Sequence, residues 1–450
     1  MYLTQRFARF IAETDYSALP EQVIYSAKER VMDTIGAAIA GSCNWEYSAA
    51  LRAACRGLGG GNTPVIGGGG ETFPAARAAM INATYAHAVE LDDGHRNAGC
   101  HAGAVIVPTA LALGGSGKDM LTAVAIGYEV TYRLASHVNP AQINKGFHPS
   151  SNCGVYGAMA VAGKRFGLSA EQLANGLGQA GMLAGGTMEA TVSGQRSKCV
   201  QVGNAAFNGI SAACFAREGM EGCLSALEGR YGLFSTQSEN VDVEDVCRDL
   251  GKVYTIGDTY NKMYPSCRHA QPGIEGVLDL VAEHGLRPED VAGIHIGTHQ
   301  VALNLTGTIK APKNSGEAKF SLAYGAAAAL RDRAFGIAHL TEPYYTDPEL
   351  LALAQNVTCG IDPEVQAAFP ERRGAKVEIV CRDGRRFEKT LYDLRGSSRK
   401  PVGWAELQDK FIANARPNFS DERLEQILRL LKELEQVEDV GILAGLLAFA

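Results

Sequence analysis

Apolar positions recur at helical spacing through most of the first half of the chain. They fall three and four residues apart between residues 21 and 39, and residues 104–113, 120–134 and 154–166 repeat the pattern. Such spacing places apolar side chains on one face of an α-helix. Glycine clusters at residues 59–61 and 67–70 mark turns between these runs. The pattern predicts a succession of helices.

The pattern changes after about Pro265. Residues 291–305 alternate between apolar and polar side chains, as a half-buried strand does, and residues 375–393 read as a hairpin with Asp383 and Gly384 at its tip. Residues 421–437 return to helical spacing. We therefore predict a mainly α fold with a large all-helical domain and a smaller α/β lid domain. Residues 1–265 would begin the helical domain, residues 266–398 would form the lid, and residues 399–450 would return to the helical domain.

Composition narrows the class of protein. A chain of 450 residues is long enough for two packed units with a buried pocket. The net charge of -7 comes from interspersed acidic and basic residues, which argues against nucleic acid or an anionic membrane as a partner. No signal-type segment or membrane-length apolar run is visible, so we expect a cytoplasmic protein.

Two further patterns exclude common cofactor sites. The 11 cysteines include no CxxC pair, which disfavours a zinc ribbon, a dithiol redox site and an iron–sulfur cluster. The string GGSGKDM resembles a phosphate-binding loop, but Lys118 is followed by Asp119 rather than by Ser or Thr, and no strand leads into it. We interpret it as a turn.

The densest group of polar residues lies in residues 87–105, HAVELDDGHRNAGCHAGAV, directly before an apolar helix. Burying carboxylates and imidazoles is unfavourable unless they have a partner or a function. The group therefore indicates catalysis, a metal site or a set of helix caps. A metal is disfavoured because the HExxH spacing is missing. The group comprises Glu90, Asp92, Asp93, His95, Arg96 and His101.

Three other places carry candidate residues. His148 precedes a helix, whose positive end lowers an imidazole pKa and favours the neutral form, although a structural histidine has the same pattern. Lys198 follows a glycine-bearing loop and is suited to hold a carboxylate, unless it is an ordinary surface charge. Residues 262–269 lie where the two predicted domains meet, a frequent location for ligands.

Eight segments, in the same order, resemble the MmgE/PrpD family, which includes 2-methylcitrate dehydratases, cis-aconitate decarboxylases and iminodisuccinate epimerases. The resemblance extends from about Val31 to Leu330 and implies a homodimer with an active site between two domains that uses no cofactor and no metal. The segments are VMDTIGAAIAG, ARAAMINATYAHAVELDDGHR, CHAGAVIVPTALALG, GYEVTYRLA, GFHPSSNCGVYGAMAVAGKRFGL, KCVQVGNAAFNGISAA, NKMYPSCRHAQPGI and FSLAYGAAAAL.

Carried over residue by residue, the resemblance assigns a set of site residues. Three departures favour a dehydratase or an epimerase over a decarboxylase. Glu90 stands where decarboxylase-like members carry Asp, and Gly94 stands where they carry Thr. Cys267 stands near the position where they carry His, and His269 could fill that role instead. The assigned residues are Glu90, His101, His148, Lys198, Lys262, Cys267, Arg268, His269 and Tyr324.

These residues suggest removal of a proton next to a carboxylate of a small di- or tricarboxylate. His101 would be the principal base or acid, oriented by Glu90 or Asp93 with a pKa near neutrality, and His148 the second proton carrier. Lys198 and Lys262 would hold carboxylates, and Tyr324 would donate a hydrogen bond. We expect a hydro-lyase similar to 2-methylcitrate dehydratase. An epimerase and a decarboxylase remain alternatives, as do a metal-dependent hydrolase built on residues 90–101 and a non-catalytic scaffold.

Overall fold

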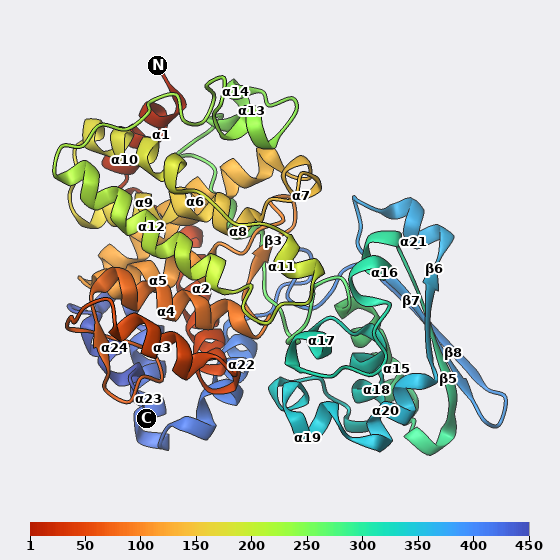
Figure 1. Cartoon of the computed structure of the whole chain (residues 1–450). Helices are drawn as coiled ribbons and strands as arrows, with labels where there is room; N and C mark the ends of the chain where they lie inside the picture. Colours follow the sequence, from red (N-terminus) through yellow and green to blue (C-terminus); the bar gives the residue numbers. More distant parts are fainter. Residues whose placement is uncertain (450) are drawn as a thin grey trace.

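The structure is a computed structural model that describes residues 1–449. Figure 1 shows a larger helical lobe, which contains the first half of the chain and the last helices, beside a smaller lobe that contains a sheet. Each lobe has its own hydrophobic core. The core of the larger lobe joins residues from both ends of the chain, such as Phe7 and Phe411. The mainly helical class that the sequence predicts is confirmed.

The larger lobe consists of closely packed helices rich in small residues. At Gly41 of α2, an added Cβ would lie 2.0 Å from the backbone oxygen of Tyr85 in α4, so only glycine permits this approach. Its long helices are α1 (Leu3–Glu13), α2 (Glu21–Asn44), α3 (Ser48–Arg56), α4 (Ala75–Ala88), α5 (Gly103–Leu113), α6 (Gly117–Val138), α9 (Gly154–Arg165), α10 (Ala170–Leu183) and α12 (Val200–Arg217). Its short helices are α7 (Ala141–Asn144), α8 (Pro149–Asn152), α11 (Glu189–Val192), α13 (Leu233–Gln237) and α14 (Val243–Val246).

The larger lobe is not entirely helical, which corrects the expectation of an all-helical domain. It carries two short antiparallel ladders, in which β1 (Thr63–Pro64) pairs with β2 (Thr72–Phe73), and β3 (Gly94–His95) pairs with β4 (Thr259–Tyr260). Two-residue strands are too short to produce an alternating pattern in the sequence. The second ladder ties the polar segment before α5 to a part of the chain more than 160 residues later.

The last helices pack against the first ones. Figure 1 shows α22 (Trp404–Ala415), α23 (Asp421–Lys432) and α24 (Gly441–Leu447) in the larger lobe, where α22 and α23 contact α2 and α24 contacts α5. Phe411 of α22 lies directly over Gly36 of α2, where an added Cβ would meet its ring at 3.2 Å. The chain thus leaves the larger lobe after β4 and returns to it at about Val402, which is buried in the same core.

The smaller lobe is built on a four-stranded sheet with the order β6-β5-β7-β8. β5 and β6 are parallel, whereas β5–β7 and β7–β8 are antiparallel, and the β7–β8 hairpin matches the sequence prediction. Figure 1 shows the sheet at the outer side of this lobe, with α15 and α18 on its inner side. The elements are α15 (Gln271–His284), β5 (Val291–Thr298), α16 (Gln300–Thr306), α17 (Ser315–Lys319), α18 (Leu322–Asp332), α19 (Glu342–Tyr345), α20 (Pro348–Gln355), β6 (Val357–Ile361), α21 (Pro363–Ala368), β7 (Ala375–Cys381) and β8 (Arg386–Leu391).

One predicted strand is shorter than expected, and one glycine-rich string is a turn, as predicted. The strand expected over residues 291–305 ends at Thr298, because His299 caps the helix α16: its Nδ1 accepts a hydrogen bond from the backbone N–H of Ala302 at 3.4 Å. The GGSGKDM string is a turn that leads into α6, where Ser116 and Asp119 form a capping box. Within residues 1–449, no helix combines the length and the apolar character needed to cross a membrane.

Candidate active site

The loop between α4 and α5 carries three acidic residues, Glu90, Asp92 and Asp93, and begins with an unusual backbone. Glu90 has a φ of +53°, in the left-handed region that favours glycine, which costs of order 1 kcal/mol or more. Val89 and Leu91 on either side are buried in the core of the smaller lobe. This packing holds the turn and keeps the Glu90 side chain buried at the junction of the lobes.

The carboxylate of Glu90 lies between two lysines. Its Oε2 accepts a hydrogen bond from Nζ of Lys262 at 2.7 Å, and its Oε1 forms an ion pair with Lys198. Burial raises the pKa of Glu90, but the two ammonium groups outweigh burial and hold the pKa well below its usual value. Glu90 is therefore an anion that positions both lysines, and it is a poor acceptor for a substrate proton.

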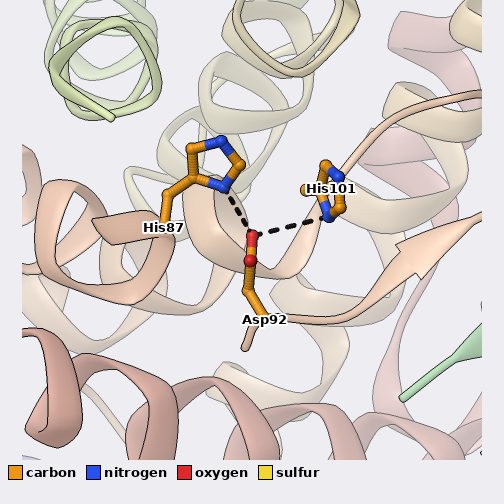
Figure 2. Close-up of side chains that lie close together, drawn as sticks. All are labelled: His87, Asp92 and His101. Atoms are coloured by element: carbon orange, nitrogen blue, oxygen red, sulfur yellow. Dashed lines mark hydrogen bonds and ion pairs between the residues drawn. The ribbon is translucent and has the colours of Figure 1, made fainter. Parts of the chain in front are cut away.

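His87, Asp92 and His101 form a second group beside Glu90. Figure 2 shows both imidazoles directed at one carboxylate oxygen: Nδ1 of His87 is 2.7 Å and Nδ1 of His101 is 3.6 Å from Oδ2 of Asp92. Lys262 approaches the other oxygen, Oδ1, at 3.6 Å. Burial raises the pKa of Asp92, but His87 and Lys262 outweigh it, so the pKa is lowered and Asp92 is ionised.

His101 is held as a neutral imidazole. Its Nδ1 lies 2.5 Å from the backbone oxygen of Asp93, which can only accept, so Nδ1 carries the proton and Nε2 keeps its lone pair. Burial and the positive charge of Lys262 lower the pKa of His101 to about 4, despite the opposing effect of Asp92. The pKa expected near neutrality is therefore wrong, because burial and Lys262 outweigh the nearby carboxylates.

Asp93 does not orient His101 through its side chain, which corrects one sequence expectation. Its carboxyl accepts hydrogen bonds from the hydroxyl of Tyr128 at 2.5 Å and from the backbone N–H of Gly103, the first residue of α5, at 3.2 Å. Burial raises the pKa of Asp93 to about 7, although Arg30 acts in the opposite direction. Asp93 therefore anchors α5, while its backbone oxygen and Asp92 orient His101.

His148 completes a cluster of three imidazoles with His87 and His101. It is the residue before α8, as the sequence predicts, and its ring centroid is 5.9 Å from that of His87, which is 5.2 Å from that of His101. Burial, together with His87 and Lys198, holds the pKa of His148 well below its usual value. Among residues 1–449, the buried Nδ1 of His148 and the buried Nε2 of His87 have no hydrogen-bond partner. Unpaired buried polar atoms are costly, so their presence here points to a ligand.

The acidic loop is braced from the last helices. Lys410 of α22 donates hydrogen bonds to the carboxylate of Asp33 in α2 at 2.6 Å and to the backbone oxygen of Leu91 at 2.9 Å. The same carboxylate accepts a hydrogen bond at 2.7 Å from the side chain of Asn261, which directly precedes Lys262. A single buried network therefore positions the loop and the lysine that faces it.

A cavity of about 160 Å³ lies beside this group, between the two lobes. Lys198 and His87 line it from the larger lobe, and Lys319 and Phe320 line it from the smaller lobe. The ammonium group of Lys319 donates to the backbone oxygen of Ala88 at 2.7 Å, and burial lowers its pKa. With Arg196, which also lines it, the cavity offers three cationic side chains and an imidazole to a small anionic ligand.

Three other expected site residues, Cys267, Arg268 and His269, lie in different surroundings. Cys267 is buried, and its backbone N–H donates to the backbone oxygen of Lys319 at 3.0 Å. Burial raises the pKa of its thiol. Arg268 lies over the ring of Tyr260 at 4.6 Å. His269 instead pairs with His299 of the smaller lobe, with Nδ1 and Nε2 3.4 Å apart. No contact joins His269 to the three imidazoles in the described part of the chain.

Tyr324 is not part of the site, which corrects its assignment. It is fully buried in the core of the smaller lobe, and its hydroxyl donates to the backbone oxygen of His339 at 2.8 Å. The hydroxyl is therefore already paired inside that lobe. The residue nearer the cavity in the same segment is Phe320, whose ring lies 5.4 Å from the ammonium group of Lys198.

Three residues of the site were not assigned from the sequence. His87 and Asp92 lie in the polar segment of residues 87–105, but nothing in the spacing shows that they pair with each other. Lys319 follows an ordinary polar stretch, and its role depends on a contact between lobes that no local pattern reveals. The signal that could have identified His87 is its position at the buried end of an alanine-rich helix.

His87, Asp92 and His101 also have the geometry of a metal site, since one ligand atom from each lies within 4.8 Å of the others. Their protons argue for hydrogen bonding instead. Nδ1 of His87 donates to Asp92 and Nδ1 of His101 to a backbone oxygen, so a metal would have to replace both protons. It would also lie close to the ammonium group of Lys262, 3.6 Å from Asp92. The donor set therefore fits a proton-transfer group better than a cation site.

Fold and site define a two-lobed, largely helical class of protein with imidazoles and lysines gathered between the lobes. The family models of the MmgE/PrpD N-terminal domain and C-terminal domain match residues 5–245 and 264–436. The chain belongs to the MmgE/PrpD family.

Three curated relatives are similar along almost their whole length. The cis-aconitate decarboxylase of Homo sapiens is 28% identical, over 99% of this chain and 94% of its own. The cis-aconitate decarboxylase-like protein oryM of Aspergillus oryzae is 27% identical, over 99% and 97%. The cis-aconitate decarboxylase of Aspergillus terreus is 27% identical, over 95% and 92%.

Proposed function

We propose that the chain is a lyase that removes the proton next to a carboxylate of a small di- or tricarboxylate and then eliminates water, as a 2-methylcitrate dehydratase does. The observation that carries the proposal is the neutral imidazole of His101, whose Nε2 keeps its lone pair and which faces the same carboxylate, Asp92, as the buried Lys262. Its acid–base groups are the protein's own side chains.

Proton removal next to a carboxylate requires both a base and a means to stabilise the charge that develops. His101 supplies the base, because its lowered pKa keeps it unprotonated at physiological pH. Lys198 and Lys319 line the cavity and can hold a substrate carboxylate while it takes up negative charge. Glu90 and Lys262 form a buried ion pair that holds these side chains in position.

A decarboxylase is the second candidate, and the curated relatives favour it. Loss of carbon dioxide also leaves a carbanion next to a carboxylate, so the same lysines would serve it, with a proton delivered to carbon instead of removed. Gly94 in place of a threonine favours the dehydratase, because the space beside His101 then holds the side chain of Tyr260.

The test is to incubate the purified protein in deuterated water with 2-methylcitrate, iminodisuccinate and cis-aconitate and to follow each acid by NMR. We expect deuterium at the carbon next to a carboxylate and loss of water from 2-methylcitrate. His101→Asn should abolish both. His284→Asn should not, because His284 is exposed on α15 and stacks on Phe387, away from the cavity. Absence of exchange with every acid would refute the proposal, and release of carbon dioxide from cis-aconitate would establish the decarboxylase.

Homodimer formation and a cytoplasmic location remain predictions. Sedimentation equilibrium of the purified chain tests the first, because a dimer has twice the mass of the 47.7 kDa chain. Fractionation of the source cells tests the second.

A further inference from the structure

Elimination of water needs an acid as well as a base, since hydroxide is a poor leaving group. The three imidazoles are poor candidates for this acid. His101 and His148 have lowered pKa values, and His87 holds its Nδ1 proton on Asp92. Lys262 is occupied by Glu90. The group that protonates the departing hydroxyl has to be found among the other side chains nearby.

Tyr260 lies directly beside His101. It belongs to β4 and pairs with Gly94 of β3. A Cβ built on Gly94 would lie 2.5 Å from the hydroxyl oxygen of Tyr260 and 3.1 Å from Nδ1 of His101. The phenol and the imidazole therefore meet over the one position of this strand that has no side chain, and any larger residue at 94 would displace one of them.

The hydroxyl of Tyr260 is available for chemistry. It forms no hydrogen bond to any other residue within 1–449, and the side chain is only partly buried. In contrast, the hydroxyl of Tyr128 in the same region is bound to Asp93. A partly exposed phenol whose hydroxyl has no partner in the protein can donate to a molecule from outside the chain.

Two cations flank the phenol. The guanidinium group of Arg268 lies over its ring at 4.6 Å, and Lys262 follows two residues later in the chain. Burial raises the pKa of Tyr260, and the charges of Lys262 and Arg268 act against that rise. These cations would stabilise the phenolate as it forms, without removing the proton beforehand.

We propose that Tyr260 is a catalytic residue that donates its phenolic proton to the hydroxyl group leaving the substrate. This inference rests on the proposed hydro-lyase function. His101 first takes the proton from the carbon next to the carboxylate, and the electrons of that C–H bond pass into the carboxylate. These electrons then form the carbon–carbon double bond, and the C–O bond breaks as Tyr260 protonates the oxygen. Water leaves, and the imidazolium then returns one proton to the neighbouring phenolate. No oxidant or co-reactant is needed.

The test separates the two proton transfers with Tyr260→Phe and three rates. With 2-methylcitrate, loss of water should fall by about 10² to 10⁴, the usual contribution of a positioned acid. Deuterium exchange at the carbon next to the carboxylate should stay within about threefold of wild type, because His101 is unchanged. With the analogue that carries chlorine in place of the hydroxyl, elimination should also stay within about threefold, since chloride leaves without a proton.

Tyr264→Phe is the matched control. Tyr264 is in the same segment and also partly buried, but its phenol lies near Glu275 and Arg395 instead of His101. We expect it to leave all three rates unchanged. Equal loss of all three rates in Tyr260→Phe would show a structural role and overturn the proposal, as would unchanged loss of water. If the wild-type protein eliminates no water, the proposed hydro-lyase function fails and this inference fails with it. If the wild-type protein eliminates water and Tyr260→Phe does so at the same rate, this inference alone fails.

Discussion

The imidazole of His101 donates through Nδ1 to the backbone oxygen of Asp93, at 2.5 Å, while the carboxyl group of the same aspartate turns away towards Tyr128. The tautomer of the proposed base is thus set by the main chain. A side-chain change at Asp93 leaves this contact in place, whereas the neighbouring Asp92 contacts the imidazoles with its carboxylate. Two adjacent acidic residues therefore have separable roles.

We predict opposite outcomes for Asp92→Asn and Asp93→Asn. Asp92→Asn removes the negative charge that faces His87, His101 and Lys262, and kcat should fall by about 10² or more, as expected when a catalytic imidazole loses its orienting carboxylate. Asp93→Asn should stay within about tenfold of wild type, since an amide oxygen can still accept from Tyr128. Steady-state kinetics of both variants, with circular dichroism to verify folding, test this prediction. A larger loss in Asp93→Asn would mean that its carboxyl group takes part in the reaction.

His101→Asn should fold normally and bind substrate within about tenfold of wild type, but lose about 10² to 10⁴ in kcat. The amide can still donate to the backbone oxygen of Asp93, but it cannot accept a proton. Deuterium exchange into the substrate should disappear with kcat. If exchange continues at the wild-type rate, His148 becomes the leading candidate for the base.

Lys198→Ala and Lys262→Ala should both lower kcat/KM, by an amount equivalent to about 2 to 5 kcal/mol, because each leaves Glu90 with one cation fewer. Their effects on stability should differ. Lys262 is completely buried between Glu90 and Asp92, so its loss should also lower Tm, whereas the Lys198 side chain is 14% exposed and its loss should leave Tm nearly unchanged. Kinetics and thermal unfolding of both variants test this. Wild-type kinetics in both would show that neither lysine helps to bind or position the substrate.

The acid limb of the pH profile should lie far below neutrality. His101 must be neutral to accept a proton, and its pKa of about 4 keeps it neutral until the pH falls through that value. We therefore expect kcat/KM to hold from neutral pH down to about pH 5 and to decrease as the pH approaches 4, while circular dichroism shows that the protein is still folded. A decrease centred between pH 6 and 7 would indicate that the base is a different group.

Exhaustive chelation should leave activity unchanged, because the lysines beside the cavity are the groups proposed to stabilise the developing charge. The measurement is the rate after dialysis against a chelator, with the metal content checked separately. Lost activity that returns with a divalent ion would assign His87, Asp92 and His101 to a metal site and would favour the hydrolase alternative.

The sequence predicted those parts of the fold that depend on local pattern. Helices such as α2 and α6, and the β7–β8 hairpin, are visible because their apolar spacing extends over many residues. The end of β5 was misplaced because a histidine cap interrupts a run that continues to look alternating. The β3–β4 ladder could not be predicted, since its two strands are two residues long and meet only through the tertiary fold.

The candidate site, too, was predicted only in part. Glu90, Lys198 and Lys262 were named from motifs, and the structure brings all three together. Tyr324 was misplaced because a motif residue in a helix shows neither which way its hydroxyl points nor that a backbone oxygen of the same lobe already binds it. Lys319 was missed because its value depends on contact with the opposite lobe.

The brace that Lys410 provides has a consequence for how the protein is made. A ribosome-bound chain synthesised as far as residue 400 already contains every imidazole and lysine of the site, yet it lacks the side chain that joins Asp33 to Leu91. The acidic loop therefore lacks this brace until α22 has been translated.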